Sequence, residues 1–351
     1  MAIIDKPTDY FQTTTYAGGT TDISSLDFQP DFVWAKKRSG AENHGLFDSV
    51  RGATKTLTIN DNAAESTRSG SLTSFDSDGW TMGGSDGIIS ASGNTYVGWA
   101  WKAGGSASSN TAGSITSSVS ANQEAGFSVV SYTAVNANAT VGHGLGVKPD
   151  VLIVKQRSAS GQGYATLHPS FAITQFVRIN ETDALRTSTD GTGNFNSTVP
   201  TSSVFSIGTA VATGGSTATM IAYCFAEKQG YSKFGRYQGN GVTDGPYIHT
   251  GFKTAWVLIK NITNADQWVL FDYKREGYNP DNDFFQPNSS NQEGTEAGAK
   301  IDLLSNGFKL RGSGGGIGQT NNNGNTFIYM AFAENPFVTS TDNGSIPATA
   351  R

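Results

Sequence analysis

The chain contains 351 residues, carries a net charge of −5 and has a single cysteine. Because it has no basic cluster, nucleic-acid binding is excluded, and one cysteine rules out an internal disulfide and a cysteine-based zinc site. Its 43 glycines, with many serines, threonines and asparagines, form helices poorly, whereas an aromatic content of 11% suits half-buried sheets. Composition therefore predicts an all-β fold of short strands and glycine-rich turns.

The first hundred residues contain an N-terminal arm, residues 1–8, and then four motifs. The motifs lie, in chain order, at residues 28–36, 46–51, 77–80 and 95–101. The first and last predict strands, and the Asp-Gly pair of the third favours a hairpin turn. A helix-like pattern near residues 63–68 lacks a strong apolar stripe.

These motifs recur later in the same order and at similar spacings. The first recurs at 147–155 and 252–260, the second at 270–275 with a degenerate copy at 166–168, the third at 305–308, and the last at 219–225 and 326–332. Four collinear matches indicate that one unit of about 100 residues is repeated three times.

The two strand motifs differ in their apolar pattern. The last motif alternates, and one face is bulky in every copy: Val97, Trp99, Trp101; Ile221, Tyr223, Phe225; Ile328, Met330, Phe332. We expect that face to meet the core. Residues 151–154 and 255–259 are apolar without interruption, which predicts central strands covered on both faces, one of them by a neighbouring unit.

We therefore predict an all-β fold of three repeated β-sandwich units in tandem, jelly-roll-like, with extended terminal arms; closed barrels are the alternative. The predicted divisions are 1–103 (first unit with the N-terminal arm), 104–125 (a Gly/Ser/Thr-rich linker or extended arm), 126–228 (second unit), 229–337 (third unit) and 338–351 (C-terminal tail). The short join at 227–230 predicts rigid packing of the second unit on the third.

Few residues point to catalysis. Cys224 aligns with Ala100 and Ala331, which indicates a small buried residue rather than a nucleophile. Asp48 is followed three residues later by Arg51, and Asp272 by Arg275. Since a catalytic carboxylate needs a second group tuned against it, the same pair in two repeats favours a polar contact that stabilises the fold.

Other motifs that could bind metals or phosphate also have structural interpretations. The histidines, His44, His143, His168 and His249, show no metal-ligand spacing. Residues 76–79 begin like a calcium loop but lack its glutamate, which favours a turn. Residues 312–318 are glycine-rich without the Lys-Ser/Thr of a phosphate loop, which favours a flexible loop. We predict no catalytic residue, no cofactor and no metal.

Aromatic side chains near predicted turns offer a further possibility, because exposed rings bind sugars by stacking. The candidates are Trp80, Tyr237 and Tyr278. Most aromatic residues at matched repeat positions are expected in the core, so glycan binding is the weaker hypothesis.

Several longer segments are characteristic of a known group of proteins. They lie at residues 5–11, 28–34, 75–80, 142–150, 222–227 and 230–235. The chain resembles, over nearly all its length, a family of uncharacterised structural proteins of tailed bacteriophages, especially phages of marine bacteria. The resemblance implies a place in the virion, in tail fibre, baseplate or capsid decoration, and it supplies no catalytic residues.

The expected function is that of a non-enzymatic virion protein, first a tail fibre or appendage component that serves assembly or host attachment. The alternatives are a capsid decoration (cement) protein that stabilises the head and a glycan-binding or glycan-degrading adhesin. Expected partners are other tail or capsid proteins, with a host surface glycan as a further candidate, in an oligomer within the particle. No apolar run of membrane-span or signal-peptide length is present, so we expect synthesis in the host cytoplasm and no membrane insertion.

Overall fold

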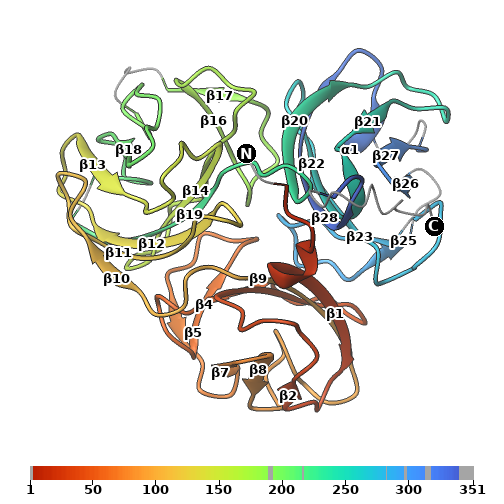
Figure 1. Cartoon of the computed structure of the whole chain (residues 1–351), viewed down its shortest axis with the longest axis horizontal. Helices are drawn as coiled ribbons and strands as arrows, with labels where there is room; N and C mark the ends of the chain where they lie inside the picture. Colours follow the sequence, from red (N-terminus) through yellow and green to blue (C-terminus); the bar gives the residue numbers. More distant parts are fainter. Residues whose placement is uncertain are drawn as a thin grey trace.

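The computed structural model describes residues 3–188, 193–215, 217–281, 283–295, 299–312 and 318–339. Within these ranges the chain is all-β, as predicted, with one 3-10 turn, Pro7–Asp9 (η1), and one short helix, Gly318–Asn321 (α1). Neither of these described helices has the length and apolarity needed to cross a membrane. Three large sheets, each with smaller sheets beside it, surround a common centre (Figure 1).

The first sheet group, red to orange in Figure 1, is built on six strands in the order β1-β9-β3-β4-β5-β6. Their bounds are Phe11–Ala17 (β1), Thr95–Trp101 (β9), Phe32–Lys37 (β3), Gly45–Asp48 (β4), Lys55–Thr58 (β5) and Ser66–Thr67 (β6). The small sheet β2-β8-β7 comprises Asp22–Ile23, Gly79–Met82 and Leu72–Asp76. The helix suggested by the pattern at residues 63–68 is absent, because this segment contains β6, which pairs with β5.

The second sheet group has eight strands in the order β10-β11-β12-β19-β14-β15-β16-β17. Their bounds are Ser108–Asn110, Ser117–Asn122, Phe127–Thr133, Thr219–Phe225, Val151–Gln156, Ala165–Leu167, Gln175–Arg178 and Arg186–Thr187. The small sheet pairs Ala139–Gly142 (β13) with Val204–Ile207 (β18). Residues 104–125, predicted as a linker or an extended arm, include β10 and β11, and β11 pairs with β12 over six residues, so the prediction of a flexible linker is wrong.

The third sheet group has four strands in the order β20-β28-β22-β23, with bounds Ser232–Gln238, Thr326–Pro336, Phe252–Asn261 and Trp268–Asp272. Its small sheet β21-β27-β26 comprises Tyr247–His249, Gly307–Leu310 and Ile301–Leu304. A two-stranded ladder joins Asp283–Phe284 (β24) to Gly294–Thr295 (β25). The short join at 227–230 is a turn in which Tyr231 and Ser232 donate to the carbonyl of Lys228.

The repeated strand motifs occupy matching places in the three large sheets. The first-motif strands β3, β14 and β22 each lie between a last-motif strand and the strand that follows them in the chain. The last-motif strands β9, β19 and β28 lie beside them, antiparallel. The division into three units at the predicted boundaries stays a prediction.

The central strands are buried on both faces, as their apolar runs predict. On the outward face Val33, Leu152 and Val257 belong to three separate clusters, each completed by one small sheet. On the inward face Phe32, Ile153 and Trp256 belong to a single cluster. All nine bulky residues of the last motif lie in this same cluster, which we call the shared core. One apolar core is therefore common to the three sheet groups.

Aromatic rings form the contacts within the shared core. Phe32 of the first group lies 4.5 Å, between ring centroids, from Tyr223 of the second. Phe332 of the third group lies 5.5 Å from Trp101 and 5.9 Å from Phe225, both edge-on. Ile4, in the N-terminal arm, is also buried in this core, and its N–H donates to the carbonyl of Gln229. Each pair of sheet groups is thus joined through tilted or edge-on rings.

Two hairpin glycines are required by close approach rather than by backbone angle. Gly79 follows the β7 turn and Gly307 the β26 turn, and neither has a positive φ. A Cβ at Gly79 would lie 1.5 Å from the carbonyl oxygen of Ile23, and one at Gly307 2.0 Å from that of Ile248. The predicted turns are present, but their glycines admit a third strand.

Truncating a ring of the shared core should destabilise the whole chain. We expect Phe332→Ala to lower the free energy of unfolding by about 3–5 kcal/mol, because it leaves a cavity among rings of all three groups. Urea denaturation followed by tryptophan fluorescence measures this change. Tyr278→Ala, at an exposed ring, is the control and should change stability by less than about 0.5 kcal/mol. Equal effects of the two variants would contradict a shared core.

Candidate functional site

The two predicted Asp–Arg pairs are fully buried. The Nε of Arg275 donates to Oδ2 of Asp272 at 2.6 Å, and Arg51 makes the same short contact to Asp48. In each case Nη2 of the arginine donates to a backbone carbonyl of the preceding strand, that of Leu46 or that of Leu270. The interpretation as contacts that stabilise the fold agrees with this geometry, since each carboxylate is occupied by its own arginine.

Each Asp–Arg pair also contacts the neighbouring sheet group. Tyr223, in β19 of the second group, donates its hydroxyl to Oδ2 of Asp48 at 2.9 Å. Trp99, in β9 of the first group, donates its indole N–H to Oδ2 of Asp272 at 3.1 Å. In the second group the degenerate motif has His168 at the position of these aspartates, and its Nε2 lies 3.2 Å from the carbonyl of Tyr329 in the third group. Three different polar groups therefore connect the sheet groups at matching positions.

Two glutamates that the sequence did not single out extend these networks across the junctions. Glu65 accepts hydrogen bonds from Arg157 of the second group at 2.8 and 3.0 Å, and from Arg51 at 3.3 Å. Glu293 accepts from Arg38 of the first group at 2.9 Å and from Arg275 at 3.0 Å. Each glutamate thus binds one arginine of its own group and one of the next.

Burial and the arginines act in opposite directions on these glutamates. Burial alone would raise the pKa of Glu65, but the hydrogen bonds of Arg157 and the charge of Arg51 outweigh it and lower the pKa below its usual 4.5. The pKa of Glu293 is lowered in the same way by Arg38 and Arg275. Both side chains are therefore charged near neutral pH and hold their arginines as ion pairs.

The lysine that ends the first motif is buried in every copy. Lys36 donates to the carbonyls of Glu42 and Ser290 at 2.7 and 3.2 Å, and Lys260 to those of Asp266 and Thr182 at 2.7 and 2.9 Å. Lys155 donates to the carbonyl of Gln162. Burial lowers the pKa of all three lysines to about 8.

Two backbone hydrogen bonds recur at each junction between groups. In one set the donor and acceptor pairs are Glu65 to Arg157 at 2.8 Å, Leu185 to Ile262 at 3.1 Å and Glu293 to Arg38 at 3.2 Å. In the other set they are Gly161 to Asn62 at 2.9 Å, Asp266 to Thr182 at 2.7 Å and Glu42 to Ser290 at 2.9 Å. The first group thus contacts the second, the second the third, and the third the first. The sheet groups close into a ring through three equivalent junctions.

The remaining polar candidates are mostly engaged in packing. Cys224 is buried beside Ala222 in the outer cluster of the second group, as predicted, and burial raises the pKa of its thiol to about 12. Burial also lowers the pKa of His44 well below its usual value, and the ring accepts a hydrogen bond from Trp34. His143 contacts the carbonyl of Thr201 at 3.2 Å.

The turn predicted at residues 76–79 can be checked in the structure, whereas most of the loop predicted at 312–318 cannot. Asp76 pairs with Gly79 across a tight hairpin, so the prediction of a turn is confirmed. Residues 313–317 lie outside the described residues. His249 is exposed, with Nδ1 3.3 Å from the hydroxyl of Tyr247. Within the described ranges, no three His, Cys, Asp or Glu side chains are grouped to hold a metal ion.

The aromatic candidates for sugar binding separate into two classes. Trp80 is fully buried in the outer cluster of the first group, and Tyr237 is 9% exposed and donates its hydroxyl to the carbonyl of Thr320. For these two the prediction of surface rings is wrong, because Trp80 in β8 and Tyr237 in β20 lie in the apolar clusters between the small and large sheets of their groups. Tyr278 is 64% exposed and stays a candidate.

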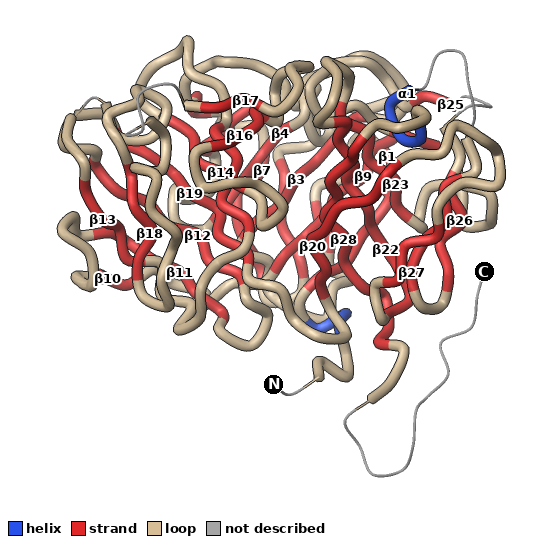
Figure 2. The backbone as a smooth tube through the Cα atoms, turned by 90° about the horizontal axis from the view of Figure 1, so that it is seen from above, coloured by secondary structure: helices blue, strands red, loops and turns tan. Residues whose placement is uncertain are grey.

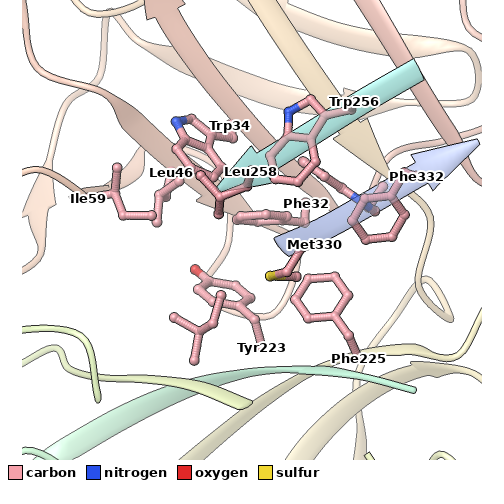
Figure 3. A pocket seen from close by; sticks show the side chains of 12 residues that line it. Phe32, Trp34, Leu46, Ile59, Tyr223, Phe225, Trp256, Leu258, Met330 and Phe332 are labelled. Carbon is pink, nitrogen blue, oxygen red and sulfur yellow. The ribbon is translucent and has the colours of Figure 1, made fainter. Parts of the chain in front are cut away.

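A small cavity of about 20 Å³ lies inside the shared core (Figure 3). Its walls are aromatic and aliphatic side chains from all three groups, among them Trp34, Tyr223 and Trp256. The space could hold about one water molecule, but an apolar cavity of this size is expected to stay dry. It is a packing defect where three sheets meet rather than a ligand site.

A larger hollow of about 320 Å³ lies on the surface, between the first and third groups. One wall is the edge strand β1 from Gln12 to Thr15, and the others are Ser25 with Leu26 and Tyr273 with Lys274. We call this hollow the β1 groove. The hydroxyl of Thr13, a residue only 4% exposed, has no hydrogen-bond partner. The sequence offers no sign of this site, because the polar residues of β1 do not indicate that the turn with Tyr273 and Lys274 will face them.

The junction glutamates offer a test that depends on pH. Glu65→Gln should lower the free energy of unfolding at pH 7 by about 2–3 kcal/mol, because Arg157 loses its carboxylate partner and buried Arg51 loses the second of its two. Since the folded pKa of Glu65 lies below 4.5, its contribution is present above that pH and is lost as the pH falls further. Urea denaturation from pH 7 to pH 3 should therefore show the two proteins converging. A difference that stays constant would contradict the ion-pair role.

Comparison with known proteins gives one match. A model of the family described as "Domain of unknown function (DUF7483)" matches residues 6–336. A search of the curated proteins and a search of the solved structures returned no match. The matched stretch begins just before η1 and ends with β28, so it includes all three large sheets. The chain therefore belongs to the family described as domain of unknown function DUF7483.

Proposed function

We propose that the chain is a non-enzymatic structural protein of a bacteriophage particle, and first of all a component of a tail fibre or another appendage. The observation that carries the structural role is the use of the buried charges. Asp48 and Asp272 are each bound by an arginine of their own sheet group, and each junction glutamate is bound by one arginine of its own group and one of the next. A carboxylate held in this way adds rigidity and is poorly placed to move a proton.

The place in a virion rests on the resemblance of the sequence motifs to structural proteins of tailed phages. Those motifs fall on strands of the large and small sheets and on the segments that lead into them: residues 28–34 enter β3, residues 75–80 lie on the β7–β8 hairpin and residues 222–227 end β19. They are therefore motifs of the scaffold. The resemblance supports a place in a phage particle, whereas the closed ring of sheet groups supports a role as a rigid structural part.

An appendage needs a rigid frame that presents variable loops. The strands run between two rims, and the loops gather along both rims (Figure 2). Exposed apolar residues such as Val199, Val242 and Tyr278 lie in segments between strands. Loops on a rigid scaffold tolerate change and carry binding functions, so attachment to a host or to another virion protein is the role that this arrangement favours.

The capsid decoration alternative loses part of its support. It relied on residues 104–125 as a mobile arm that could clamp neighbouring capsomers, but β10 and β11 tie this segment to the second sheet. A role as a glycan-binding adhesin keeps exposed Tyr278 as its candidate ring.

Location in the particle can be tested directly. Phage particles whose genome encodes this chain would be purified and labelled with gold-conjugated antibody raised against the chain, with particles of an unrelated phage as the control. We expect gold on the tail or its appendages. Gold confined to the head would replace the appendage role with decoration, and absence of the chain from the particles by mass spectrometry would contradict any virion role.

A further inference from the structure

The outer edge of β1 has backbone groups that pair with no strand. β1 is the first strand of its sheet, at the end that faces the third group (Figure 1). Lys102 donates to the carbonyl of Tyr10, and Gly18 donates to that of Asn94, so the even-numbered residues bond to β9. Because antiparallel strands alternate, Thr13 and Thr15 direct their N–H and C=O groups away from β9. In the described part of the chain no backbone hydrogen bond reaches them.

This edge also lacks the usual protection of an edge strand. Native edges are blunted by charged side chains, proline, bulges or a covering segment. β1, Phe11–Ala17, contains no charge and no proline, and its register with β9 runs without a bulge. The β1 groove of about 320 Å³ lies along it. Thr15 is exposed and Thr13, although only 4% exposed, borders the groove, so the strand keeps an unpaired edge where most edges are closed.

The second sheet group shows what fills the matching edge. β12 has the same place as β1, because Phe127 pairs with Phe225 as Phe11 pairs with Trp101. On its other side β12 pairs with β11, antiparallel, over Ser117–Asn122. The residues of β12 that match Thr13 and Thr15 are Val129 and Ser131, which lie opposite Ser120 and Ser118.

The third sheet group closes the matching edge differently. Its edge strand is β20, in which Phe234 matches Thr13 by its pairing with Met330. The N–H of Phe234 donates to Oε2 of Glu227 at 3.1 Å. Of three matching edges, one is paired with a strand, one is capped by a carboxylate, and that of β1 has neither.

We propose that the edge of β1 binds an extended peptide segment of a partner protein, with small uncharged side chains, which pairs antiparallel as β11 pairs with β12. Main-chain hydrogen bonds to Thr13 and Thr15 supply the recognition, and the β1 groove limits the side chains to small ones. β11, with the sequence Ser-Ser-Val-Ser-Ala-Asn, is the internal example of such a segment. The proposal does not depend on a place in a virion.

The probe for this site is a fluorescent synthetic peptide with the sequence of residues 115–123, added to the full-length protein. Binding is measured by fluorescence anisotropy. Thr15→Pro removes an N–H that points away from β9, so the sheet stays paired while the docking edge loses a donor. Thr15→Val keeps that N–H and is the matched control. We expect Thr15→Pro to weaken binding about tenfold and Thr15→Val to leave it within about twofold.

The peptide offers a second test that does not depend on folding of the variants. In β11 the residues that bond to β12 are Ser118 and Ser120, whereas Val119 and Ala121 turn their N–H groups the other way. N-methylation at the two serine positions should abolish binding, and N-methylation at the other two should not. Absence of saturable binding at up to about 1 mM peptide, or equal effects of the two methylation patterns, would overturn the proposal. Binding of a soluble glycan in the groove without peptide binding would also overturn it.

Discussion

Burial of the inward faces of β3, β14 and β22 in one shared core is the interaction on which the other features of this structure depend. A strand that is apolar on both faces must be covered on both, and each small sheet covers only one face. The second face can then be buried only against another sheet group that also has an uncovered apolar face. Three such sheets meet around one point, and the rings of Phe32, Phe225 and Phe332 fill the space between them.

The polar contacts follow from that arrangement. Wherever the sheet groups meet, charged groups lose water, so each must find a polar partner in its own group or in the next. Arginines meet glutamates at two junctions, and lysines meet backbone carbonyls at the ends of the first-motif strands. A buried ion pair adds little net stability, but a buried charge without a partner is costly. These contacts therefore fix the angle at which neighbouring groups can dock.

Much of the fold could be predicted because it depends on side-chain alternation. The faces of the last motif, the two-faced burial of residues 151–154 and the buried place of Cys224 all follow from which neighbours are bulky or apolar. The segment 104–125 was predicted wrongly for a physical reason. Its Gly, Ser and Thr residues suit a linker, yet β11, which lies between β10 and β12, needs little more than backbone hydrogen bonds and small side chains.

Other features depend on contacts between distant segments, and no local pattern reports them. Trp80 was expected on the surface because it follows a turn, but that turn belongs to a sheet that lies over the first group. Glu65 and Glu293 resemble ordinary surface residues until a neighbouring group brings them a second arginine. The β1 groove exists only because Tyr273 and Lys274 face a strand more than half the chain away.

The most direct test of the shared core is native-state hydrogen exchange measured by mass spectrometry. If the three sheet groups stabilise one another through one core, the amides of β3, β14 and β22 should exchange only through the same global opening, at one common free energy. Phe332→Ala, in the third group, should then reduce protection equally in all three strands. Exchange of one central strand at a clearly lower free energy, or an effect of the variant confined to β22 and β28, would contradict this account.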